Sequence, residues 1–102
     1  TLKKSDVSKF GTIVTSIGIK DIPVEIWENL LINRHFKGDW GDLCPEDIET
    51  NNYAYKGDGH WILSVYKKAY KGKDIWIETH GYGIPKESAD YNHTVVMFPE
   101  EH

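Results

Sequence analysis

The chain has little cysteine and no long apolar run. Cys44 is the only cysteine among 102 residues, so a framework of intrachain disulfides is excluded. No stretch of about 18 apolar residues is present, and residues 1–5 do not begin an apolar signal-peptide core. These absences are typical of a protein that folds in a reducing compartment, and we expect a cytoplasmic location with no membrane span.

An excess of positive charge is also missing. With 12 Lys and Arg against 16 Asp and Glu, the net charge of −4 gives no general attraction to nucleic-acid backbones. The charges are nevertheless uneven, since three acids crowd the predicted start of one helix and four lysines crowd one predicted loop (Glu46, Asp47 and Glu49; Lys67, Lys68, Lys71 and Lys73). Aromatic residues are abundant, with four Trp and six Tyr, so we expect some rings at a binding surface.

The length of 102 residues fits a single domain, in which residues 1–8 form a flexible arm. Runs rich in β-branched and aromatic residues predict four strands, at Phe10–Ser16, Trp61–Lys67, Asp74–Thr79 and His93–Phe98. Apolar residues at helical spacing and well-placed prolines predict two helices, at Pro23–Phe36 and from Pro45 to Gly57. The order β-α-α-β-β-β predicts an α+β fold in which two helices pack on one face of an antiparallel sheet.

The predicted strands carry apolar residues on both faces. If Ile75 and Ile77 face the helices together with Leu63, Val65, Val95 and Met97, alternation sends a second set to the opposite face (Ile62, Tyr66, Trp76, Val96 and Phe98). Antiparallel sheets usually alternate apolar with polar residues instead. We interpret Tyr66, Trp76 and Phe98 as a contact surface for a protein partner, and the alternative is that the amino-terminal segment covers them.

Residues 34–42 join the two predicted helices and combine acids with bases. An imidazole beside a carboxylate can act as a general acid or base, and an arginine can hold an anionic group. His35, Asp39 and Arg34 are therefore candidate catalytic residues. The spacing matches no nucleophile elbow, phosphate loop or zinc motif, and we expect no cofactor.

A structural interpretation of the same stretch competes with the catalytic one, and we favour it. Gly38 suits the left-handed residue that ends a helix, and Arg34 and His35 would then neutralise the last carbonyl groups. Asp39 would bond backbone amides, while Trp40 and Gly41 would be structural residues between the helices.

Three further sets of residues have both a functional and a structural interpretation. His80 and His93 flank one loop and could bind a metal with Glu78, but we favour histidines at strand ends, as for His60, and expect no metal. Cys44 precedes a helix start that would stabilise its thiolate, but it matches no nucleophile pattern, and we favour a packing residue at the helix entry. The lysine loop, which comprises residues 66–73, could hold a nucleic-acid strand, but a solvated turn is the favoured interpretation (Lys67, Lys68, Tyr70, Lys71 and Lys73).

Several stretches together resemble a family of short plasmid-related proteins found on bacterial plasmids and integrative elements. The resemblance covers most of the chain from Phe10 onward. It is carried by Arg34-His35, Gly38-Asp39-Trp40-Gly41-Asp42, Ile75-Trp76-Ile77-Glu78-Thr79 and Thr94-Val95-Val96-Met97-Phe98-Pro99-Glu100-Glu101. The resemblance implies a bacterial mobile genetic element as the setting and supplies no mechanism.

Three functions remain open at this point. The first is a non-enzymatic protein-binding module that inhibits a host defence complex, such as a restriction or CRISPR system, or serves in plasmid maintenance. The second is a small toxin-like nuclease that uses His35, Asp39 and Arg34, with the lysine loop on the substrate. The third is a structural or regulatory homodimer that buries its second sheet face on itself.

Overall fold

The computed structural model of the protein describes residues 10–56, 60–82 and 93–101. The expected arm at residues 1–8, the end of the second helix at Gly57 and most of the loop between the last two strands lie outside these residues. The fold is α+β, as predicted. Within the described ranges, no helix is long and apolar enough to cross a membrane.

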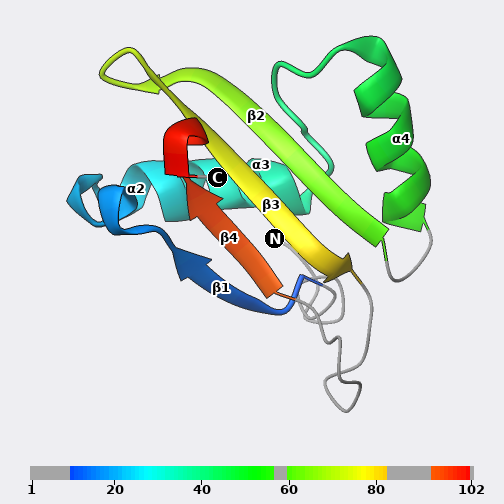
Figure 1. Cartoon of the computed structure of the whole chain (residues 1–102), viewed down its shortest axis with the longest axis horizontal. Helices are drawn as coiled ribbons and strands as arrows, with labels where there is room; N and C mark the ends of the chain where they lie inside the picture. Colours follow the sequence, from blue (N-terminus) through cyan, green and yellow to red (C-terminus); the bar gives the residue numbers. More distant parts are fainter. Residues whose placement is uncertain (1–9, 57–59, 83–92, 102) are drawn as a thin grey trace.

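Four strands form one mixed sheet in the order β1-β4-β3-β2 (Figure 1). Their bounds are Thr12–Thr15 for β1, His60–Tyr70 for β2, Lys73–Tyr82 for β3 and His93–Met97 for β4. The β2–β3 and β3–β4 pairs are antiparallel, as expected, whereas β1 lies parallel to β4. The sheet therefore joins its first and last strands side by side.

The helical part of the fold lies mainly on one face of this sheet. The first predicted helix is a continuous segment with three parts, α2 (Val24–Ile26), η2 (Trp27–Ile32) and α3 (Asn33–Phe36). It runs behind the sheet, while α4 (Pro45–Lys56) flanks the edge formed by β2 (Figure 1). Two short 3₁₀ helices that the sequence pattern did not predict, η1 (Ile17–Asp21) and η3 (Pro99–Glu101), complete the described chain.

The η2 segment is a π-helix, and its wider turn changes which residues face the core. In a π turn the hydrogen bonds join residues five apart, so neighbours on one face are also shifted by one position. Leu31 and Ile32 are buried, whereas Leu30 is 54% exposed. Regular α-helical spacing predicts a core-facing stripe of Ile26, Trp27, Leu30, Leu31 and Arg34. Leu31 is buried, and Ile26 and Trp27 pack against the core, so the prediction is wrong for Leu30.

The strand register corrects the predicted second apolar face. Tyr66 pairs with Ile75, is 1% exposed and points toward the helices, whereas Trp76 pairs with Val65 and points to the other face. Phe98 follows β4 and is also buried. The predicted common contact face of Tyr66, Trp76 and Phe98 is therefore wrong. Both faces of β2 and β4 carry apolar residues, so the alternation of residue types did not determine which residues pair across the strands. A shift of this pairing by one residue exchanges the inward and outward faces of a strand.

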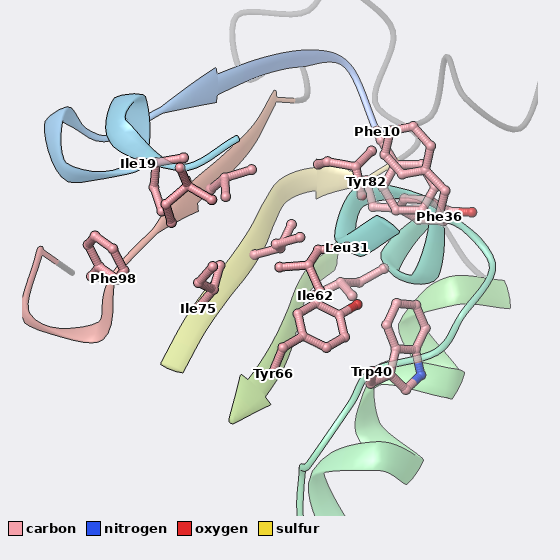
Figure 2. Close-up of a cluster of buried hydrophobic side chains, with 14 of the residues drawn as sticks. Phe10, Ile19, Leu31, Phe36, Trp40, Ile62, Tyr66, Ile75, Tyr82 and Phe98 are labelled. Atoms are coloured by element: carbon pink, nitrogen blue, oxygen red, sulfur yellow. The ribbon is translucent and has the colours of Figure 1, made fainter. Parts of the chain in front are cut away.

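Aromatic rings form much of the core. Phe10 stacks on Phe36 with 4.3 Å between ring centroids, and its ring lies 4.9 Å from that of Tyr82. Tyr55 links Tyr82 to Trp40 through centroid separations of 5.5 and 5.3 Å. Figure 2 shows Phe10, Phe36, Tyr82 and Trp40 at one end of the core and Ile19 and Phe98 at the other. Many of the abundant aromatic residues therefore stabilise the interior and are not available to a partner.

Candidate functional site

The turn after α3 ends the helix in the predicted way. Gly38 has a φ of +85°, which a glycine adopts without a Cβ penalty. The amide of Asp39 donates to the carbonyl of Arg34 at 2.9 Å, and the amide of Gly38 donates to the carbonyl of His35 at 3.2 Å. These two bonds form a Schellman motif, which satisfies carbonyl groups that the helix itself leaves unpaired. The prediction that Gly38 stops the helix is confirmed.

Arg34 and Asp39 form an ion pair across this turn. The Arg34 Nε and Nη2 atoms donate to the two carboxylate oxygens of Asp39 at 2.7 and 3.2 Å. This bond raises the pKa of Arg34 and lowers the pKa of Asp39. The guanidinium also lies 4.6 Å from the centroid of the Tyr66 ring, and the Asp39 carboxylate accepts the amide of Gly41. Both charges are thus paired within the turn, and the predicted bond from a backbone amide to Asp39 is confirmed.

Trp40 and Gly41 attach the turn to the edge of the sheet. Trp40 is 3% exposed, and its indole N–H donates to Asn52 Oδ1 at 2.8 Å. Val65 in β2 donates its amide to the carbonyl of Trp40 and accepts the amide of Asp42, at 3.0 and 2.7 Å. A Cβ on Gly41 would overlap the carbonyl oxygen of Val65, so only glycine allows this close approach. The structural roles predicted for Trp40 and Gly41 are confirmed.

His35 lies inside the protein, and its predicted role in neutralising the helix end is wrong. Its side chain is fully buried between α3 and the sheet. The imidazole Nδ1 lies 2.6 Å from Ser64 Oγ, and Nε2 lies 2.8 Å from Thr79 Oγ1. Burial lowers the pKa of His35 to about 3, because a charged imidazole would lose its hydration without gaining a counterion. His35 is therefore neutral at physiological pH.

A chain of buried hydrogen bonds fixes the tautomer of this imidazole. Thr94 uses its hydroxyl hydrogen to donate to the carbonyl of Phe10 at 2.7 Å, because a carbonyl can only accept. Thr79 must then donate to Thr94 across their 2.8 Å contact, so Thr79 accepts a hydrogen from His35 Nε2. His35 Nδ1 is left to accept the hydroxyl hydrogen of Ser64. Each hydroxyl hydrogen in the chain has an acceptor.

The predicted catalytic pair of His35 and Asp39 is not formed. The imidazole bonds to Ser64 and Thr79, whereas the Asp39 carboxylate bonds to Arg34 and Gly41. A serine next to a histidine can also be a nucleophile and its base, but Ser64 and His35 are fully buried. Polar residues at inward strand positions were the sequence signal for this network, and reading it required the strand register.

His80 and His93 are cross-strand neighbours, as predicted. Their rings stack with 4.8 Å between centroids and 14° between planes, and His80 Nε2 contacts a carboxylate oxygen of Glu78. The lone pair of an imidazole nitrogen lies in the plane of its ring. Because the two rings are nearly parallel, their lone pairs lie in two separate planes and do not point toward one shared position. In the part of the chain that the structure describes, no group of three His, Cys, Asp or Glu residues could hold a metal ion. The side chain of His60 lies outside that part.

The lysine loop forms the predicted tight turn between β2 and β3. Lys71 and Gly72 both have positive φ, at 48° and 78°. The ammonium group of Lys71 lies 5.4 Å from the Tyr70 ring centroid, and that of Lys73 lies 5.2 Å from the Phe98 ring centroid. These lysines thus lie over aromatic rings of the protein itself. Nucleic-acid contact through Lys67, Lys68, Tyr70, Lys71 and Lys73 stays a prediction.

Cys44 is exposed just before α4, so the favoured interpretation as a packing residue at the helix entry is wrong. The alternative, a stabilised thiolate, is wrong as well. The backbone amide of Asp47 lowers the pKa of the thiol, as a helix start should. The carboxylates of Asp47 and Glu46 act in the opposite direction, because negative charges disfavour a thiolate. The carboxylates and the desolvation of the thiol together outweigh the backbone amide, so the pKa of Cys44 is raised.

Two large aromatic side chains are exposed around α4 and the adjoining end of β2, and sequence reasoning missed this surface. Tyr53 is 73% exposed and Trp61 is 51% exposed. Two adjoining hollows share Thr50: one contains Tyr53, and the other, of about 270 Å³, contains Trp61. We call this region the α4–β2 surface, and its residues are Leu43, Glu46, Asp47, Glu49, Thr50, Asn51, Tyr53, Trp61 and Leu63.

Comparison with known proteins gives no relative for this chain. No protein-family model, no curated protein and no solved structure matches it.

Proposed function

We propose that this chain is a non-enzymatic protein-binding module. The observation that supports this proposal most is the exposure of Trp61 and Tyr53 on the α4–β2 surface, where both rings border hollows. Large aromatic side chains contribute a high share of binding energy at protein interfaces, and apolar surface is costly to leave in water. The partner is a protein that covers these two rings.

The internal bonding of the ionisable residues also favours a binding module over the nuclease alternative. An acid–base catalyst must reach the proton that it transfers. His35 is buried, and Arg34 and Asp39 neutralise each other. A nuclease that used these three residues would have to open its core and break an ion pair, whereas a binding module needs neither change.

The proposed setting is a bacterial mobile genetic element, and it rests on the resemblance of residues 34–42, 75–79 and 94–101 to plasmid-related proteins. In that setting the partner belongs to a host defence complex of the restriction or CRISPR type, or to the plasmid-maintenance machinery. A homodimer is the third possibility, in which a second copy covers the α4–β2 surface.

The test is capture of partners by the immobilised chain from lysate of a bacterial host, with three proteins compared. We expect a specific partner to be captured by the wild type and lost by the Tyr53→Ala/Trp61→Ala double variant. Leu30→Ala is the matched control, because Leu30 is also an exposed large apolar residue but lies on η2. Equal capture by all three proteins would contradict the assigned surface, and light scattering on the purified chain identifies self-association.

A further inference from the structure

The hollow between α4 and β2 has an apolar wall and a polar rim. Among the described residues, its lining consists of Leu43, Asp47, Thr50, Asn51, Trp61 and Leu63. Small-molecule sites usually measure roughly 300–1,000 Å³. At about 270 Å³ this hollow lies just below that range, so it suits one side chain better than a whole cofactor.

Hydrogen bonds already made within the protein decide which polar groups of the hollow remain for a partner. Asn51 bonds to both backbone groups of Leu63, since its amide nitrogen donates to the carbonyl at 2.6 Å and its oxygen accepts the amide. Thr50 donates its hydroxyl hydrogen to the carbonyl of Glu46 at 3.0 Å, so its oxygen can only accept a further bond. The Asp47 carboxylate also only accepts, and it has more lone pairs than the Cys44 thiol occupies.

Apart from the indole N–H of Trp61 and the second amide hydrogen of Asn51, the polar side-chain groups that remain are acceptors, and the Asp47 carboxylate carries a negative charge. Glu46 and Glu49 on the same helix add further negative charge beside the hollow, and none of the six lining residues is basic. An occupant must therefore offer hydrogen-bond donors and benefits from positive charge. It must also present a flat or apolar part to the half-exposed indole of Trp61.

We propose that this hollow binds an arginine side chain of a protein partner. A guanidinium group stacks on the face of an aromatic ring while its N–H groups donate to a carboxylate in the same plane. Trp61 supplies the ring, Asp47 the carboxylate and Thr50 a further acceptor. The proposal deepens the proposed function, on which it rests, because it gives the chemistry of the partner group that meets the α4–β2 surface.

The test is a titration of the full chain, ¹⁵N-labelled, with Nα-acetylarginine methylamide, followed by NMR. We expect saturable shifts of the Trp61 indole N–H and of backbone amides around Thr50, with a dissociation constant on the order of 1–10 mM, as for one partly exposed contact. Nα-acetylcitrulline methylamide has nearly the same shape without the charge. It should bind at least about fivefold more weakly.

Matched variants assign the contact to its residues. Asp47→Asn should weaken arginine binding at least about fivefold, whereas Glu28→Gln, the same charge change on η2 and outside the α4–β2 surface, should alter it less than about twofold. Trp61→Ala should abolish the saturable shifts, and Trp61→Phe should retain part of the binding because it retains a ring. Equal binding of the citrulline compound, or no effect of Asp47→Asn, would overturn the arginine site.

The two proposals can fail separately. A partner that is captured through Tyr53 and Trp61, but binds equally well to Asp47→Asn, would sink the arginine proposal and leave the binding module intact. Saturable arginine binding at Trp61 without any captured protein would support the site and contradict the proposed function.

Discussion

The imidazole of His35 donates from Nε2 to the hydroxyl of Thr79, 2.8 Å away on β3. This bond connects α3 to the centre of the sheet and belongs to a chain that continues through Thr94 to the carbonyl of Phe10. Buried polar groups stabilise a fold only when every member is paired. The described buried side-chain nitrogen and oxygen atoms all have a hydrogen-bond partner, which makes the network sensitive to any substitution.

The buried imidazole should make stability depend on pH. Its pKa is about 3 in the folded protein and about 6.5 in the unfolded chain, so between these values the unfolded chain binds more protons. The contribution of His35 to the free energy of unfolding is therefore fully present above pH 6.5 and is lost as the pH falls toward 3. The slope approaches about 1.4 kcal/mol per pH unit from this one residue. Urea unfolding at several pH values measures it.

The variant His35→Gln isolates this contribution from those of the carboxylates. At neutral pH it should cost about 1–3 kcal/mol, because a flexible amide replaces the rigid imidazole that bonds to both Ser64 and Thr79 inside the core. As the pH falls below 6.5, the difference between wild type and variant should shrink, since the variant has no imidazole to protonate. Parallel stability curves for the two proteins would contradict the assignment of the pH dependence to His35.

Trp40 should be among the most important core residues. Replacing it with Ala removes a buried ring between α3 and α4 and should cost roughly 3–5 kcal/mol in chemical denaturation. Asn52→Ala is the matched comparison, because it removes only the acceptor of the indole N–H and should cost about 1 kcal/mol. Similar losses for both variants would show that the hydrogen bond, and not the packing, dominates.

Glycine substitutions should separate backbone strain from steric overlap. Gly72→Ala introduces a Cβ at positive φ with no neighbour within 4 Å and should cost only the conformational penalty of about 1–2 kcal/mol. Gly41→Ala adds an overlap with the Val65 carbonyl to a similar φ, so it should destabilise the protein more and release residues 40–42 from β2. Hydrogen exchange of the Asp42 amide reports that release, and equal protection in both variants would contradict it.

The thiol of Cys44 should react slowly at neutral pH although it is exposed. The carboxylates of Asp47 and Glu46 raise its pKa, so little thiolate is present at pH 7. Asp47→Asn should increase the rate with a disulfide reagent at pH 7, because the amide of residue 47 remains while its charge is lost. Glu49→Gln should change the rate less, since Glu49 does not act on the thiol. Similar rates for all three proteins would exclude control by Asp47.

The sequence was sufficient to predict where the four strands and the two longer helical segments lie, because local signals determine them. Gly38 and Pro45 mark the ends of helices through their own backbone preferences, and both markers agree with the structure. The β2–β3 hairpin also follows from residues close in the chain, with Gly72 in its turn.

Features that depend on distant residues were not predictable in the same way. The burial of His35 requires Ser64 and Thr79 on inward positions of two strands, and that register is set by the whole sheet. The π turn that exposes Leu30 has no local sequence marker. The sequence pattern places Trp61 at the start of a strand but does not indicate its exposure, which depends on how α4 lies beside β2.

The parallel pairing of β1 with β4 also determines the order in which the protein can fold. The bond from Thr94 to Phe10 spans 84 residues, so it forms only after nearly the whole described chain has been brought together. Closing so long a loop costs entropy before any contact compensates for it, which slows folding. We expect the β2–β3 hairpin to form early and β1 to dock last. Pulsed hydrogen exchange during refolding should therefore protect the amide of Tyr66, which pairs with Ile75 in β3, before the Ser16 amide, which bonds to Val96.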